Sequence, residues 1–102
     1  MKMTREEEII DSILGVLKKF SKQLQGFQVV LFGSRARGDA KSRSDFDLGV
    51  VGGKSLDIKT FYEIDDKLDE LENLYRIDWV DLNRVSSTFR RIALKNAVKI
   101  YG

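Results

Sequence analysis

The residues with the clearest chemical potential are two aspartates, Asp45 and Asp47, and a Gly33-Ser34 pair that precedes them by ten residues. Residues two apart on a strand point to the same face, with Cα atoms about 6.5–7 Å apart. Two carboxylates this close repel each other unless a cation joins them. Ions roughly 3.5–4 Å apart are the arrangement used in two-metal phosphoryl transfer. The aspartates therefore indicate a metal site that handles phosphate.

The Gly33-Ser34 pair follows an apolar run at 29–32 and opens a short turn at 34–38. Glycine lets the backbone turn there and approach a phosphate closely. The Ser34 hydroxyl and the amides of the turn can donate to phosphate oxygens, and Arg35 and Arg37 add positive charge. Taken alone, the pair is also what an ordinary turn with a capping serine looks like.

Composition and spacing exclude several other site classes. The chain has no histidine and no cysteine, so catalytic triads, thiol nucleophiles and imidazole or thiolate metal sites are ruled out. Gly33 and Gly38 have the spacing of a P-loop, but Asp39-Ala40 stands where Lys and Ser/Thr are required. An EF-hand loop that began at Asp45 would put Val50 at the obligatory glycine.

A first helix is predicted from Thr4, which has capping-box spacing to Glu7, to a stop at Gly26. Its apolar positions follow the 3.6-residue period of one buried face. These positions are Ile9, Ile10, Ile13, Leu14, Leu17, Phe20 and Leu24.

Strands are predicted at 27–32, 45–51, 75–82 and 98–101, the last as a short edge strand. A second helix is predicted from about 56 to 73, with an apolar face of Ile58, Phe61, Ile64, Leu68 and Leu71. A last helix should be capped by Ser86 or Ser87 and should turn Phe89, Ile92 and Ala93 inward.

This order predicts a two-layer α+β domain over residues 1–102, with a mixed sheet of about four strands and helices on one face. Phe46, Leu48 and Val50 should then face the helices, and the two aspartates should lie on the uncovered face. No apolar run reaches the roughly 20 residues that span a bilayer, and the N-terminus lacks a signal peptide, so we expect a cytoplasmic protein without membrane contact.

Charge is distributed unevenly along the chain. Residues 83–102 carry five cations and no acid, whereas residues 54–74 carry seven acids against three lysines. Such asymmetry suits a charged partner or ligand, and solvated helix surfaces produce it too.

The whole pattern is similar to the signature of the DNA polymerase β-like nucleotidyltransferase superfamily. The resemblance rests on Gly33-Ser34, ten intervening residues and Asp45-Phe46-Asp47, and the local sequence looks most like the minimal (MNT, MntA-like) members. It extends over essentially the whole chain, including the preceding helix and the closing Ile100-Tyr101-Gly102.

The resemblance implies that Asp45 and Asp47 bind two Mg²⁺ ions and that the Gly33-Ser34 turn holds the phosphates of ATP or another NTP. It also implies a third carboxylate on a neighbouring strand. Asp78 and Asp81 are three apart and so face opposite sides of a regular strand. The family pattern of an early aspartate favours Asp78 as the third catalytic and metal-binding residue. We interpret Asp81, at the strand end, as a solvated or capping residue.

Minimal members of the superfamily are typically paired with a HEPN-domain toxin, and some transfer AMP to a tyrosine of that toxin. The resemblance therefore implies an adenylyltransferase-type antitoxin with a HEPN-domain partner and no direct nucleic-acid binding. Two alternatives stay open: an antitoxin that neutralises its partner by contact alone, and a small-molecule nucleotidyltransferase that uses a homo-oligomer interface as its acceptor pocket.

Overall fold

The structure is a computed structural model that describes residues 3–38, 45–71 and 76–102. The predicted helix end at Asn73 and the predicted strand start at Tyr75 lie outside the described residues. Within the described ranges, no helix combines the length and the apolar character needed to cross a membrane. The helices and strands run in the order α1 (Arg5–Lys19), β1 (Gln28–Phe32), α2 (Ser34–Arg37), β2 (Phe46–Val51), α3 (Ile58–Asp69), β3 (Ile77–Asp81), α4 (Ser87–Leu94) and β4 (Val98–Tyr101).

Helix α1 begins where the capping box predicts. The Thr4 hydroxyl accepts a hydrogen bond from the Glu7 amide at 3.1 Å. The helix ends at Lys19, earlier than the predicted stop at Gly26, because Phe20 leaves the helical backbone region at φ −110°. The chain then continues in turns to Gly26, whose φ of 83° is a left-handed conformation that suits glycine.

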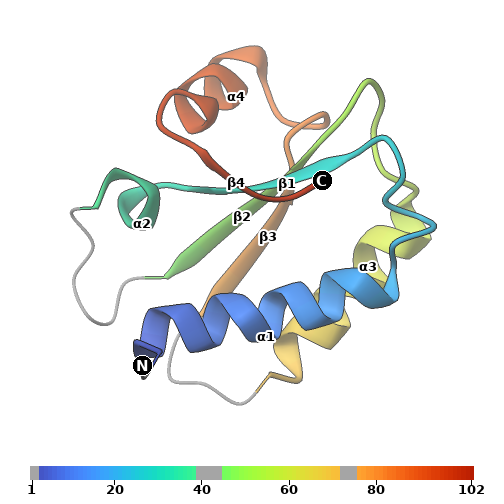
Figure 1. The fold of residues 1–102 in the computed structure, drawn as a ribbon. Coiled ribbons are helices and arrows are strands. Elements are labelled where there is room, and N and C mark those ends of the chain that lie inside the picture. Colours follow the sequence, from blue (N-terminus) through green and yellow to red (C-terminus); the bar gives the residue numbers. More distant parts are fainter. Residues whose placement is uncertain (1–2, 39–44, 72–75) are drawn as a thin grey trace.

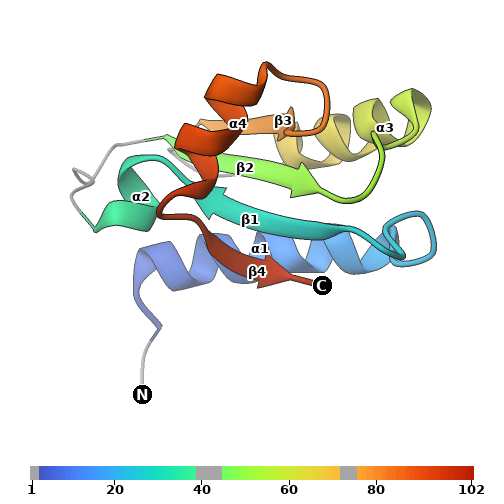
Figure 2. The same ribbon diagram turned by 90° about the horizontal axis from the view of Figure 1, so that it is seen from above.

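The four strands form one mixed sheet in the order β3-β2-β1-β4. Strand β1 pairs antiparallel with both β2 and β4, and β2 pairs parallel with β3. A parallel pair needs a crossover connection, which here contains α3. The predicted α+β class with a mixed sheet is confirmed, and β4 is an edge strand as predicted (Figure 2).

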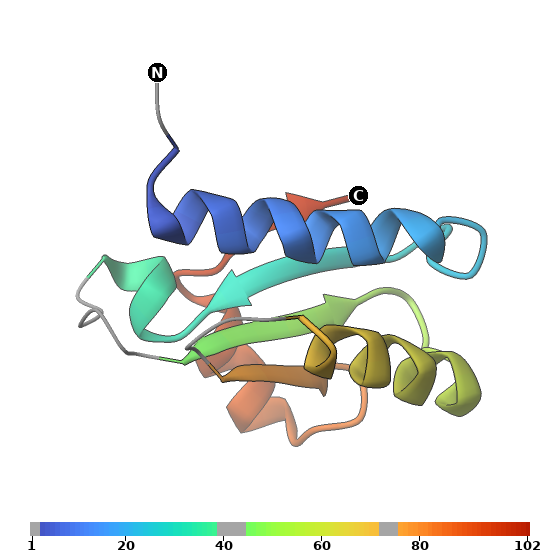
Figure 3. The same ribbon diagram turned by 90° about the horizontal axis from the view of Figure 1, so that it is seen from below.

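The larger core lies between the sheet and the helices α1 and α3, which cover the same face (Figures 1 and 3). Phe46, Leu48 and Val50 of β2 are fully buried in it, as the alternation of the strand predicts. From α1, Ile13 and Leu17 are also fully buried, and α3 contributes Ile64 and Leu68.

Helix α4 corrects one part of the fold prediction, that all helices pack on one face. It lies on the face opposite α1 and α3 (Figure 1). There Ala93 packs with Val30, Phe32 and Leu82 in a second, smaller core. The alternation of β1 explains this second core, because Val30 and Phe32 point away from the face that buries Val29 and Leu31.

The prediction that Phe89 and Ile92 point inward is also wrong in part. Ser86 caps α4, but only Ala93 of the helix is buried, while Phe89 and Ile92 are 44% and 66% exposed. Ile92 and Ala93 are neighbours in sequence and so differ by about 100° around the helix. A similar miss occurs on α3, where Ile58 is 49% exposed.

Candidate active site

Two aspartates from neighbouring strands face each other at one end of the sheet. Asp47 of β2 is paired in register with Asp78 of β3, and on its other side with Phe32 of β1. Asp45 directly precedes β2 and is exposed. Asp78 and the neighbouring Val80 lie on the α4 side of the sheet, since Ile77 and Trp79 pack into the α1–α3 core. The fold thus places the three predicted carboxylates at the same end of the sheet, close enough to act on one another electrostatically.

The carboxylates of Asp45 and Asp78 lie close enough to that of Asp47 for their negative charges to repel it. Burial raises the pKa of the Asp47 carboxyl above its ordinary value, and the negative charges of Asp78 and Asp45 raise it further. A hydrogen bond with the Asp78 side chain acts in the same direction, while the positive charge of Arg37 opposes the shift. Divalent cations prefer such groups of oxygen ligands, and a cation here would relieve the repulsion.

The Gly33 turn is fitted against the carboxylate of Asp47. Gly33 has φ 74° and ψ −155°, a backbone region essentially restricted to glycine. A Cβ atom at this position would collide with Oδ2 of Asp47. The turn and the aspartate are therefore close neighbours, which only a residue without a side chain permits.

After Gly33 the chain forms a single helical turn, α2, which the sequence had indicated only as a turn. The amides of Ala36 and Arg37 donate to the Gly33 carbonyl at 3.1 and 3.2 Å. Ser34 is the first residue of this turn, where backbone amides lack acceptors within the turn. The positive charge of Arg37 lowers the pKa of Asp47, so the turn interacts electrostatically with the carboxylates.

Arg35 takes a different position from the one predicted for a nucleotide-binding residue. Its side chain is only 6% exposed and forms an ion pair with Glu6 of α1 at 3.0 Å. Its guanidinium also lies 4.4 Å from the ring centroid of Phe46. In this arrangement Arg35 joins α1, α2 and the start of β2. Its guanidinium therefore lies among these elements and helps to hold the turn in place.

Asp78 has a cation beside it. Arg76 precedes it by two residues and forms an ion pair from Nε to Oδ1 at 3.0 Å. No three acidic side chains of the described ranges converge in a ready metal-ligating arrangement. The side chain of Arg76 is 77% exposed and can swing into solvent, which would leave the Asp78 carboxylate to another cation.

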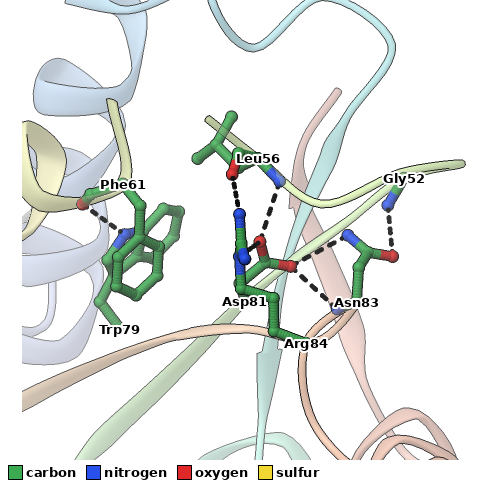
Figure 4. A network of polar contacts seen from close by, with 7 residues as sticks. All are labelled: Gly52, Leu56, Phe61, Trp79, Asp81, Asn83 and Arg84. Atoms are coloured by element: carbon green, nitrogen blue, oxygen red, sulfur yellow. Dashed lines mark hydrogen bonds and ion pairs between the residues drawn. The ribbon is translucent and has the colours of Figure 1, made fainter. Parts of the chain in front are cut away.

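Asp81, three residues further along β3, lies on the other face and is 5% exposed. Its carboxylate accepts from the Leu56 amide at 2.9 Å and from both the backbone and side-chain nitrogens of Asn83 at 2.9 and 3.1 Å, and Arg84 lies 3.4 Å away (Figure 4). Of the two roles expected for Asp81, the solvated one is wrong, whereas the carboxylate does cap backbone amides. Asp81 is a buried connector between β3 and the segment that enters α3.

Two site neighbours, Glu6 and Arg76, were not predicted. For Arg76 a signal exists, because residues 76 and 78 lie two apart in the strand predicted at 75–82 and carry opposite charges. Glu6 belongs to a run of three glutamates at the start of α1, and nothing in that run distinguishes it. Only the packing of α1 beside α2 brings it to Arg35.

The chain belongs to the polymerase β nucleotidyltransferase family, whose model matches residues 16–102. It is 33% identical over 88 residues to a Haemophilus influenzae protein named "probable protein adenylyltransferase MntA", covering 85% of this chain and 77% of the relative. A Methanocaldococcus jannaschii protein with a similar name is 31% identical over 80 residues, which are 74% of this chain and 92% of that protein. These findings confirm the family resemblance and identify the chain as a nucleotidyltransferase.

Solved structures share the fold. A toxin–antitoxin structure with AMP-PNP superimposes with a TM-score of 0.63 at 23% identity, covering 88% of this chain and 73% of that chain. A tri-AMPylated Shewanella oneidensis HEPN toxin in complex with its MNT antitoxin gives 0.60 at 20% identity, over 92% and 72%. A minimal nucleotidyltransferase gives 0.61 at 23% identity, over 96% and 98%.

Proposed function

We propose that this chain transfers AMP from ATP to a hydroxyl group of a HEPN-domain partner protein, with a tyrosine as the acceptor, and thereby acts as an antitoxin. The observation that carries the proposal is the register of Asp47 with Asp78 beside the Gly33 turn. It is supported by the names of two relatives above 30% identity, both of which are called protein adenylyltransferases.

In this proposal Asp45, Asp47 and Asp78 hold Mg²⁺, which when bound polarises the α-phosphate and stabilises the entering and leaving oxygens. The raised pKa of Asp47 fits a carboxylate group that needs a cation partner. Gly33, Ser34 and the turn amides hold the triphosphate, and Arg37 compensates part of its charge. Arg35 acts from beneath the turn through Glu6 and Phe46.

The chemical step would form a bond between the acceptor oxygen and the α-phosphorus. The bond from that phosphorus to the bridging oxygen breaks, and pyrophosphate leaves with the electron pair. The acceptor proton passes to the Asp78 carboxylate, whose side chain is 34% exposed. Arg76 must release Asp78 for this role.

The test is mass spectrometry of a HEPN-domain protein that co-purifies with this chain or is encoded by a neighbouring gene, after incubation with the purified chain, ATP and Mg²⁺. We expect a gain of one or more AMP groups on tyrosine. The double variant Asp45→Asn/Asp47→Asn should give none. An unmodified partner with the wild-type chain would overturn the proposal. If the partner is inhibited equally by both forms with and without ATP, neutralisation by contact alone is the function.

A further inference from the structure

Helix α4 presents an apolar surface to solvent on the same side of the sheet as the carboxylates. Phe89 and Ile92 are 44% and 66% exposed. Ala93, with the smallest apolar side chain, is the buried residue of α4, while Phe89 and Ile92 stay accessible. Large exposed apolar residues gathered in this way are typical of interaction surfaces.

Among the described residues that line this surface, the charged ones are cations. Arg91 and Lys95 line a hollow of about 700 Å³ together with Ile92 and Leu94. The sequence contains no acidic residue after Asp81, so no side chain of the segment 82–102 offsets these charges. We use the term α4 surface for Phe89, Arg91, Ile92 and Lys95.

The α4 surface is continuous with the candidate active site. Phe89 and Ile92 line a second, smaller hollow whose other wall contains Gly33 and Arg37. The Phe89 ring also packs edge-on against Phe32, which is paired in register with Asp47. A molecule that covers α4 therefore lies beside the turn and the carboxylates.

We infer that the α4 surface is the docking surface for the acceptor protein, and that the matching patch on the acceptor protein is apolar with an acidic rim. This inference rests on the proposed function and adds the surface and the chemistry of the partner. Docking at α4 would bring the acceptor hydroxyl next to Asp78 and the nucleotide. Complementary charge around an apolar centre would guide the approach and orient the partner.

The geometry argues against two other occupants. A second copy of this chain would have to supply the acid-rich helix α3, which lies on the opposite face of the sheet (Figure 1). Such a head-to-tail contact is heterologous and gives rings or open chains instead of a two-fold dimer. The phosphates and sugars of a nucleic-acid backbone would pair with the cations of this surface but would leave the exposed Ile92 without an apolar partner.

The experiment measures the affinity of the neighbouring-gene HEPN-domain protein for wild type, Ile92→Asp and Arg91→Glu/Lys95→Glu. Matched controls are Ile58→Asp and Lys59→Glu/Lys67→Glu on α3, where Ile58 is 49% exposed. We expect each α4 variant to bind at least about ten-fold more weakly, as for the centre of an interface. The α3 controls should bind like wild type. Circular dichroism melts and the thermal shift with MgATP should be unchanged in all, which separates docking from folding and from nucleotide binding.

Unchanged partner affinity in both α4 variants, or equal losses in the α3 controls, would overturn the inference. So would self-association that Ile92→Asp abolishes, or binding of a single-stranded RNA 20-mer that the charge variant abolishes, if partner affinity stays as in wild type. A wild-type complex without AMP transfer would refute the proposed function and leave the docking result to be judged by the affinities alone.

Discussion

One face of the sheet carries α1 and α3 over a continuous apolar core, whereas the other carries α4, a much smaller core and the carboxylate cluster. On the first face, β2 contributes Phe46, Leu48 and Val50, all fully buried. On the second, the same strand contributes Asp47 and Gly49, where an added Cβ would collide with the side chain of Leu82. A single strand thus supplies stability on one side and chemistry on the other, because its side chains alternate.

The difference shows where the fold tolerates strain. Burial and the neighbouring carboxylates raise the pKa of Asp47 and so destabilise its ionised form, while the core on the opposite face holds β2 in place. Functional sites commonly keep such unfavourable charge arrangements at the expense of stability. Changes on the two faces should therefore have separable effects on activity and on unfolding.

The largest expected effect separates the two aspartates of β3. Asp78→Asn should reduce AMP transfer by on the order of 100-fold or more, because it removes a ligand and the proton acceptor. Its melting temperature should not fall. Asp81→Asn should leave transfer by the folded protein intact and lower the free energy of unfolding by about 1–3 kcal/mol, because the Leu56 and Asn83 amides lose a buried acceptor.

Initial rates of partner labelling and urea denaturation, measured on the same preparations, check this pair. Transfer lost with Asp81→Asn and retained with Asp78→Asn would reverse the two assignments.

The next effect concerns the turn between the two halves of the site. Gly33→Ala should lower the free energy of unfolding by about 1–3 kcal/mol, because its backbone conformation is essentially restricted to glycine. It should also weaken MgATP binding, because the new methyl group displaces Asp47. Gly15→Ala is the control: this glycine is in α1 with open space around it, so alanine should stabilise by roughly 0.5–1 kcal/mol. Denaturant melts and nucleotide titrations of both variants test this prediction. A Gly33→Ala variant as stable as wild type would contradict the backbone strain.

The smallest effect is on pH dependence. Because the pKa of Asp47 is raised in the folded protein, its ionised form destabilises the fold, and this penalty disappears as pH falls through the raised value towards the unfolded one. Asp47→Asn should therefore raise the melting temperature at pH 7, and its advantage over wild type should shrink on acidification. Added Mg²⁺ should raise the melting temperature of wild type more than that of the variant.

The control for this comparison is Asp11→Asn, an exposed position on α1, which should shift the melting temperature little. A lower melting temperature of Asp47→Asn at pH 7 would contradict the charge strain described above.

Local spacing was enough to predict several features. The Thr4–Glu7 box starts α1, and the alternation of β2 places Phe46 and Leu48 in the core with Asp47 opposite. The same alternation separates Asp78 from Asp81, although it did not predict that Asp81 would be buried. These features depend on residues two to four apart, so backbone periodicity alone decides them.

Contacts between distant segments could not be predicted in this way. The sequence predicts that Arg35 is a phosphate-binding cation. The ion pair with Glu6, 29 residues away, shows that its side chain helps to hold the turn in place. The last helix faces the sheet with a different side from the one predicted: Ala93 packs in the second core, and Ile92 lies outside it. The spacing of Gly33, Asp45 and Asp47 indicated the chemistry, whereas the packing of α4 on the second face decided which surface lies beside it, because helix packing depends on the volume left between the elements.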